Sequence, residues 1–172
     1  MKNKITLAAL VLTLGVPQLA SAQAVTSSLL GLYQITKDNI VASAQMLEED
    51  MYAFRPTDEV RSMGQLFAHV AGAQYAFCSA AAGESNPMTE NFEQTRTTKA
   101  SIVEALELGF GYCEGVYARM TDDMGGQSVT FFGGPNTAFG VLAFNSAHNY
   151  EHYGNLVTYM RLNGITPPSS MQ

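Results

Sequence analysis

Residues 137–163 read TAFGVLAFNSAHNYEHYGNLVTYMRLN and predict one long helix that carries two histidines. Asn136 or Thr137 supplies the side-chain oxygen that commonly caps the first turn of a helix. A glycine and two prolines follow within residues 164–168. They are typical of a helix end, because glycine permits the left-handed turn and proline cannot continue the hydrogen bonding. These residues are therefore expected to form the last helix of the domain.

Three further segments carry apolar residues at the spacing of one helix face, and we predict helices over about residues 27–52, 62–83 and 97–125. The first ends at Arg55-Pro56, because the residue before a proline is pushed out of the helical region. The second begins at a capping box, in which Ser62 and the glutamine three residues later satisfy each other's backbone.

The connections complete the predicted architecture. Residues 84–96 are polar and contain a proline, so we interpret them as a long connection that permits a crossover. Residues 128–132, SVTFF, could be extended, but no partner run is apparent and we predict a loop. The expected fold is all-α: a four-helix bundle with a long connection between helices 2 and 3.

The first 22 residues differ from the rest. Two lysines precede an apolar run over residues 5–16, and Ala20-Ser21-Ala22 provides the small-x-small pattern of a cleavage site. We predict a signal peptide over residues 1–22, cleaved after Ala22, and a bundle domain over residues 23–172. The mature protein is expected to be secreted or periplasmic.

The charge balance limits the partners. Cleavage would remove two lysines and no acid, leaving 7 basic against 15 acidic residues and a formal charge of −8 instead of −6. An acidic chain without a basic cluster argues against nucleic acid and anionic membranes as partners. No segment after the signal is apolar enough for a membrane helix. The sequence leaves open whether the bundle forms a homodimer.

Two cysteines, Cys78 and Cys113, belong to the mature chain. An even number in an exported protein favours a disulfide, with two buried thiols as the alternative. A catalytic cysteine is disfavoured, because no histidine lies near either one in the sequence.

Three histidines are the candidate metal ligands. His148 and His152 are four residues apart on the predicted last helix, about 40° around its axis and about 6 Å along it, so both rings can reach one ion. His69 lies in the middle of the second helix among apolar neighbours. A lone histidine there would be a core residue, but the pair on another helix makes it the third ligand.

Other metal-binding bundles fit less well. A di-iron carboxylate bundle needs Glu-x-x-His, but Leu66, Asn145 and Asn149 occupy the required positions. A haem bundle leaves one histidine unexplained, and the H-E-x-x-H motif of zinc proteases is absent. Three histidines with an open coordination position are typical of a catalytic metal.

The chain resembles the DinB-like superfamily in residues 64–70 (GQLFAHV), 147–155 (AHNYEHYGN) and, for exported members, 159–169 (YMRLNGITPPS). The resemblance implies a four-helix bundle and a divalent metal, often zinc or nickel, held by one histidine of the second helix and two of the fourth. These are His69, His148 and His152 here. Characterised members include thiol-dependent S-transferases and a thiol-dependent isomerase of the cytoplasm, whereas this chain is expected to be exported.

Several residues near the histidines have two interpretations. Gln65 and Asn145 could orient an imidazole or could be polar residues at the core edge. Glu151 is the candidate catalytic base, or a solvated glutamate on the helix surface. Gly133 and Gly134 fit a lid as well as an ordinary turn.

Two functions follow from these features. The first is a metal-dependent enzyme of the hydrolase or transferase type that acts on a small molecule in the cell envelope. The alternative is a non-catalytic periplasmic module that binds a metal or uses it as a structural staple. A third hypothesis is a bundle that contains three buried histidines and binds no metal.

Overall fold

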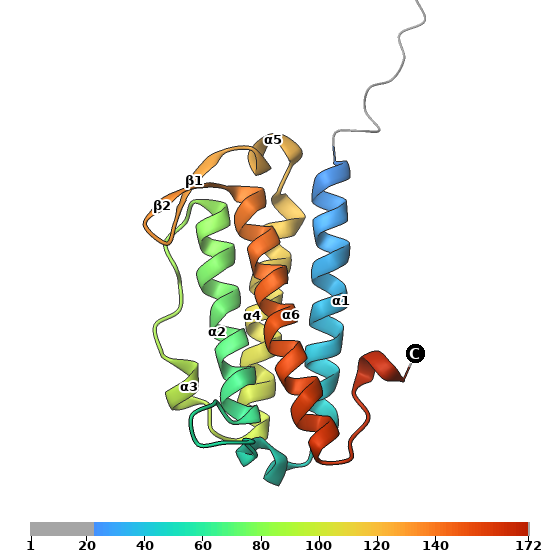
Figure 1. The fold of residues 1–172 in the computed structure, drawn as a ribbon. Coiled ribbons are helices and arrows are strands. Elements are labelled where there is room, and N and C mark those ends of the chain that lie inside the picture. Colours follow the sequence, from blue (N-terminus) through green and yellow to red (C-terminus); the bar gives the residue numbers. More distant parts are fainter. Residues whose placement is uncertain (1–22, 172) are drawn as a thin grey trace, which may run out of the picture.

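A computed structural model describes residues 23–171, which are mostly helical (Figure 1). The four long helices are α1 (Ala24–Met46), α2 (Met63–Ala82), α4 (Lys99–Arg119) and α6 (Ala138–Leu162). The short elements are η2 (Glu49–Ala53), α3 (Phe92–Thr95), α5 (Asp122–Gly125), β1 (Ser128–Phe131), β2 (Gly134–Thr137) and η3 (Pro168–Ser170). The predicted all-α class is confirmed. The signal peptide predicted for residues 1–22 lies outside the described residues.

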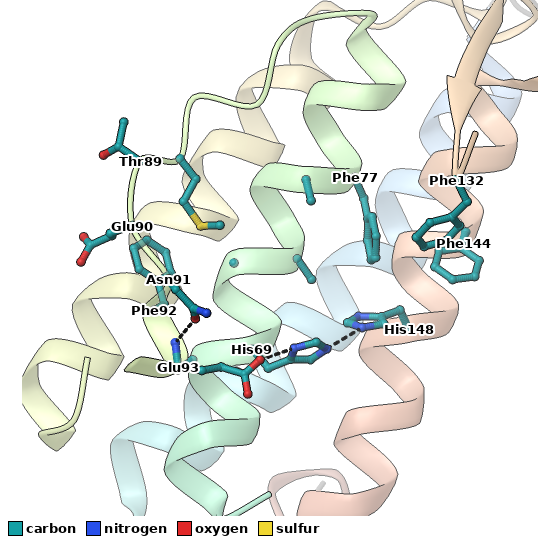
Figure 2. Close-up of a pocket in the computed structure, with 15 residues that line it drawn as sticks. His69, Phe77, Thr89, Glu90, Asn91, Phe92, Glu93, Phe132, Phe144 and His148 are labelled. Carbon is teal, nitrogen blue, oxygen red and sulfur yellow. Dashed lines mark hydrogen bonds and ion pairs between the residues drawn. The ribbon is translucent and has the colours of Figure 1, made fainter. Parts of the chain in front are cut away.

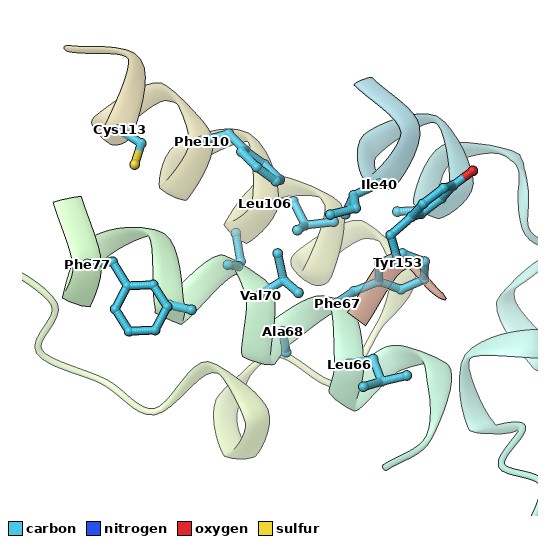
Figure 3. Close-up of a cluster of buried hydrophobic side chains, with 14 of the residues drawn as sticks. Ile40, Leu66, Phe67, Ala68, Val70, Phe77, Leu106, Phe110, Cys113 and Tyr153 are labelled. Atoms are coloured by element: carbon cyan, nitrogen blue, oxygen red, sulfur yellow. The ribbon is translucent and has the colours of Figure 1, made fainter. Parts of the chain in front are cut away.

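The long helices surround one apolar core. Helix α2 packs against α4 and α6, and α1 packs against the same two helices from the other side. Figure 3 shows the core side chains that these helices contribute, including Ile40, Phe67 and Phe110, all of them fully buried. Each such side chain stabilises the fold by about 1.5–3 kcal/mol relative to leaving it exposed.

Helices α2 and α4 approach each other closely at Gly109. A Cβ built on this glycine would lie 2.5 Å from the carbonyl oxygen of Ala71 on α2. Hydrogen is therefore the one side chain that this contact accommodates without a shift of the backbone.

The predicted helix signals at both ends of α2 are confirmed. Ser62 Oγ accepts from the backbone N–H of Gln65, and the Gln65 side chain accepts from the backbone N–H of Ser62, which forms the capping box. Gly83 closes the helix in the left-handed region with φ 68°. Thr137 caps α6 by accepting from the N–H of Gly140.

The prediction of unbroken helices over residues 27–52 and 97–125 is wrong. Helix α1 ends at Met46, because the chain turns extended at the buried Leu47 and the hydroxyl of Tyr52 donates to the carbonyl of Ala44. Helix α4 ends at Arg119, because the chain turns extended at the buried Met120. The apolar pattern continues past each helix end because these residues still fill the core.

The prediction of a loop over residues 128–132 is also wrong. Strand β1 pairs antiparallel with β2, and Phe131 stands opposite Gly134. The tight turn between them places Phe132 at φ 48° and Gly133 at φ 77°, as in the primed turns that suit a hairpin. The partner strand reads GPNT, and its lack of apolar alternation explains why the pairing was not apparent.

Two buried features tie the helices together. Cys78 on α2 and Cys113 on α4 form a disulfide with a Cα–Cα distance of 5.4 Å, which confirms the favoured prediction. Gln74 Nε2 donates to Asn149 Oδ1 at 2.8 Å, and Asn145 Nδ2 donates to Gln74 Oε1 at 2.9 Å. These fully buried amides fix α6 against α2. No helix within residues 23–171 combines the length and apolar character needed to cross a membrane.

Candidate metal centre

The three histidines converge on one point between α2 and α6. His69 Nε2 lies 3.1 Å from His148 Nε2, and His152 Nε2 lies 3.0 Å from the same atom. All three ligand atoms lie within 4.8 Å of one another. Figure 2 shows the rings of His69 and His148 pointing toward each other from the two helices.

The helices produce this arrangement without strain. His148 and His152 are one turn apart on α6, so their rings leave the same face of the helix. His69 faces them from α2, whose position beside α6 is fixed by the hydrogen bonds of Gln74 with Asn145 and Asn149. The geometry therefore depends on the regular backbone of the two helices and on the buried hydrogen bonds of Gln74 between them.

The donor set fits a divalent ion. Two ligand nitrogens of a tetrahedral zinc site lie about 3.3 Å apart, given zinc–nitrogen distances of about 2.0–2.1 Å, and the spacings of 3.0 and 3.1 Å are close to that value. Imidazole is a ligand that suits both zinc and nickel. Without an ion, the Nε2 atom of His148 can donate to only one of its two neighbours, His69 and His152.

The protonation states favour metal binding. Burial, together with the nearby rings of His152 and His69, lowers the pKa of His148 to about 3. Burial and His69 lower the pKa of His152 to about 4. Both rings are therefore neutral at neutral pH, which is the form that coordinates a metal.

Glu93, which the sequence reasoning missed, holds His69 in place. The Nδ1–H of His69 donates to Glu93 Oε1 at 2.8 Å, so Nε2 presents its lone pair to the site. Arg61 Nε donates to Glu93 Oε2 at 2.8 Å. Burial raises the pKa of Glu93, but the hydrogen bonds from Arg61 and His69 outweigh it and leave the pKa below its usual range. The carboxylate is thus charged and fixed.

The ring of His148 is oriented by packing. The Nδ1 atoms of His148 and His152 are buried and have no hydrogen-bond partner within residues 23–171. Phe77 meets the His148 ring edge-on with the ring centres 5.0 Å apart, and Phe144 stacks on it at 6.4 Å. The site therefore combines a hydrogen-bonded ligand, His69, with a ligand held by aromatic side chains, His148.

The other predicted supporting residues lie elsewhere. Gln65 is engaged in the capping box and accepts from Arg55, and Asn145 belongs to the buried amide network. Neither side chain forms a hydrogen bond with a histidine in the described part of the chain, so of the two interpretations the structure favours polar residues at the core edge. Glu151 is exposed on α6 and forms no hydrogen bond there with His148 or His152. A catalytic role for Glu151 stays a prediction.

A cavity of about 670 Å³ opens beside His69 and His148 (Figure 2). Its floor is α2, one wall is the connection between α2 and α4, and the other wall is α6 with the β1–β2 hairpin. The lining residues are Ala68, His69, Gly72, Ala73, Ala76, Phe77, Met88, Thr89, Glu90, Asn91, Phe92, Glu93, Phe132, Phe144 and His148. Two of the three histidines thus face a space large enough for a small molecule.

The sequence profile of the DinB superfamily matches residues 32–156. This span is more than half of the chain and includes all three histidines, so the protein belongs to the DinB superfamily. The resemblance stated from the sequence motifs is confirmed. No curated protein matches the chain significantly.

Solved structures share the fold at low sequence identity. A DinB-like protein from Bacillus cereus ATCC 10987 has a TM-score of 0.72 at 17% identity, over 83% of this chain and 95% of that one. A DinB-like protein from Bacillus subtilis has a TM-score of 0.63 at 19% identity, over 84% and 94%. A mycothiol-dependent maleylpyruvate isomerase has a TM-score of 0.63 at 17% identity, over 76% of this chain and 60% of its own.

Proposed function

We propose that this protein is a divalent-metal enzyme of the cell envelope, of the hydrolase or transferase type, built on a DinB-like four-helix bundle. The observation that carries the proposal is the convergence of three imidazoles beside a cavity. His69, His148 and His152 would hold zinc or nickel. Export rests on the signal-like sequence of residues 1–22.

A bound divalent ion would supply Lewis-acid chemistry, which polarises a carbonyl or lowers the pKa of a water or thiol. The chain's own residues position and enclose the site. Glu93 and Arg61 keep the lone pair of His69 directed inward. Phe77 and Phe144 pack against the ring of His148 beside the cavity.

Proton transfer has two candidate carboxylates. Glu93 lines the cavity, but it is engaged by His69 and Arg61 and its lowered pKa suits a positioning role. Glu151 is free in solvent and is our predicted base. Glu151→Gln should lower turnover at least roughly tenfold if the carboxylate accepts a proton, and should leave it unchanged if the residue is a solvated glutamate.

The structural similarity to a mycothiol-dependent isomerase suggests that a thiol should be tested as a second substrate. The decisive assay uses protein loaded with zinc or nickel against panels of esters, amides and thiol–electrophile pairs. Metal-dependent turnover that disappears in His152→Ala supports the enzyme. Turnover no higher than in that variant, in protein that contains the metal, contradicts it.

A non-catalytic metal staple is the second candidate, because the histidines join two helices, α2 and α6. A bound ion would cross-link these helices and stabilise the fold by binding only the native state. Metal-loaded protein that melts at a higher temperature than the metal-free protein but turns over no substrate would favour this alternative.

A further inference from the structure

The cavity extends away from the histidines as a trench along α2. Its floor consists of small residues, of which Ala68, Gly72 and Ala76 are spaced four apart and therefore lie on one face of the helix. Eight residues of helix span about 12 Å. The trench thus offers an extended surface that begins next to His69.

Both walls of the trench carry apolar side chains. Met88 and Phe92 form the wall contributed by the connection, and a Cβ built on Gly72 would lie 3.5 Å from Met88 Sδ. On the other side, Phe77 packs edge-on against Phe144 with the ring centres 5.3 Å apart. Figure 2 shows these aromatic rings on opposite sides of the opening.

The charges at the trench are already compensated. Glu93 is paired with Arg61 and His69, and Glu90 is paired with Arg96 at 2.6 Å. The described lining contains no lysine or arginine. A ligand tail that carries charge would therefore find no partner there, whereas an uncharged apolar tail would bury surface against both walls.

Phe132 marks the open end of the trench. Its side chain is 78% exposed, although its ring lies 5.6 Å from that of Phe144 and 6.2 Å from that of Phe77. Its φ of 48° is unfavourable for a residue with a bulky side chain. The positive φ belongs to the hairpin turn, but the exposed ring buries little apolar surface in the fold, and exposed apolar side chains beside a cavity are found at binding sites.

The geometry points to a substrate with an uncharged aryl or alkyl tail, up to about 12 Å long, that lies in the trench under Phe132 and carries one metal-binding group at its inner end. The inner group rests on the proposed function, because it requires a metal at the histidines. The tail does not, because its walls are formed by this chain alone.

Titration calorimetry with three probes tests the two parts separately. The compound 4-phenylbutyramide has the apolar tail without an anionic end, butyramide lacks the ring, and 4-phenylbutyrate has a carboxylate in place of the amide. We expect 4-phenylbutyramide to bind wild type at least roughly tenfold more tightly than butyramide, from burial of the ring. Equal affinities for the two amides would overturn the trench.

Ala76→Phe fills the trench two turns of α2 away from His69. It should weaken binding of 4-phenylbutyramide at least roughly tenfold and leave the metal content unchanged. Ala118→Phe, on the exposed face of α4, is the matched control and should bind as wild type does. Unchanged binding in Ala76→Phe would contradict the proposal.

The carboxylate probe isolates the inner end. In zinc-loaded protein 4-phenylbutyrate should bind more tightly than the amide, and His152→Ala should abolish that difference without affecting the amide, because His152 is not part of the trench lining. If the amide binds as expected but the carboxylate gains nothing from zinc, the metal-binding inner group is wrong and the apolar trench is supported, whereas the proposed function fails only when the turnover assay shows no metal dependence.

Phe132→Gly supplies a second variant. Glycine adopts a positive φ freely, so the melting temperature should be no lower than that of wild type, while binding of 4-phenylbutyramide weakens severalfold. Phe132→Tyr keeps the ring and should retain the affinity. Wild-type affinity in a folded Phe132→Gly protein would exclude Phe132 from the site.

Discussion

The long helices and the two connections that flank the cavity contribute different things to the site. Helices α2 and α6 provide all three histidines, which helical spacing places opposite one another. The connection after α2 provides Glu93, and the β1–β2 hairpin provides Phe132. The regular elements thus place the three candidate metal ligands, whereas the irregular ones orient His69 and add Phe132 to the cavity.

The largest expected effect tests the part of the site that the helices provide, and it comes from removing a bound metal ion. If the ion joins α2 and α6, chelation should lower the melting temperature of wild type by about 10 °C, since a ligand present at a thousandfold excess over its Kd contributes about 4 kcal/mol. The measurement is a thermal melt with and without chelator. His148→Ala should be insensitive to the chelator, and an unchanged wild-type curve would contradict the stapling of the two helices.

The disulfide stabilises a different helix pair, α2 and α4, and should be independent of the metal. Replacing Cys78 and Cys113 by serine should lower the free energy of unfolding by about 4 kcal/mol, because the disulfide closes a loop with a sequence separation of 35 residues. Denaturant unfolding measures the loss. The metal content should remain that of wild type; a double variant that loses the metal would show that the two helix pairs are coupled.

Glu93→Gln tests what the connection between α2 and α4 contributes to the site. The amide cannot hold the His69 ring as a charged carboxylate does, so metal affinity should fall about 10–100-fold. Competition with a chromogenic chelator gives the affinity. Glu90→Gln is the matched control from the same connection, because Glu90 pairs with Arg96 and does not contact a histidine. Equal effects of the two substitutions would remove the special role of Glu93.

The smallest expected effects compare two glycines of α4. Gly109→Ala should destabilise the protein by about 1–3 kcal/mol, because its Cβ would meet the Ala71 carbonyl oxygen at 2.5 Å. Gly111→Ala should stabilise it by about 0.5–1 kcal/mol, since nothing lies within 4 Å of that Cβ and alanine favours the helix. Denaturant unfolding separates the two; the same sign for both would contradict the packing of α2 on α4.

The sequence predicted the helical part of the site well. Spacing alone placed His148 and His152 on one face, and capping signals at Ser62 and Thr137 located the starts of α2 and α6. These predictions succeed because they depend on local geometry. The continuous helices predicted over residues 27–52 and 97–125 failed, because apolar periodicity also continues through the extended residues that fill the core after each helix end.

The contributions of the connections could not be predicted from local patterns. Glu93 lies 24 residues from His69, on the four-residue helix α3 that the cap at Asn91 begins, and nothing in its local spacing indicates a histidine partner. Asn145 has a suitable spacing on α6 but faces the core, where Gln74 accepts its hydrogen bond. These outcomes depend on how distant segments pack, which no local period specifies.

Elemental analysis of the purified protein, compared with His152→Ala, tests the central claim most directly. The three converging imidazoles predict one zinc or nickel ion per wild-type chain and almost none in the variant. A wild-type protein that contains no stoichiometric metal, or a His152→Ala protein that retains it in full, would contradict a metal centre at these histidines.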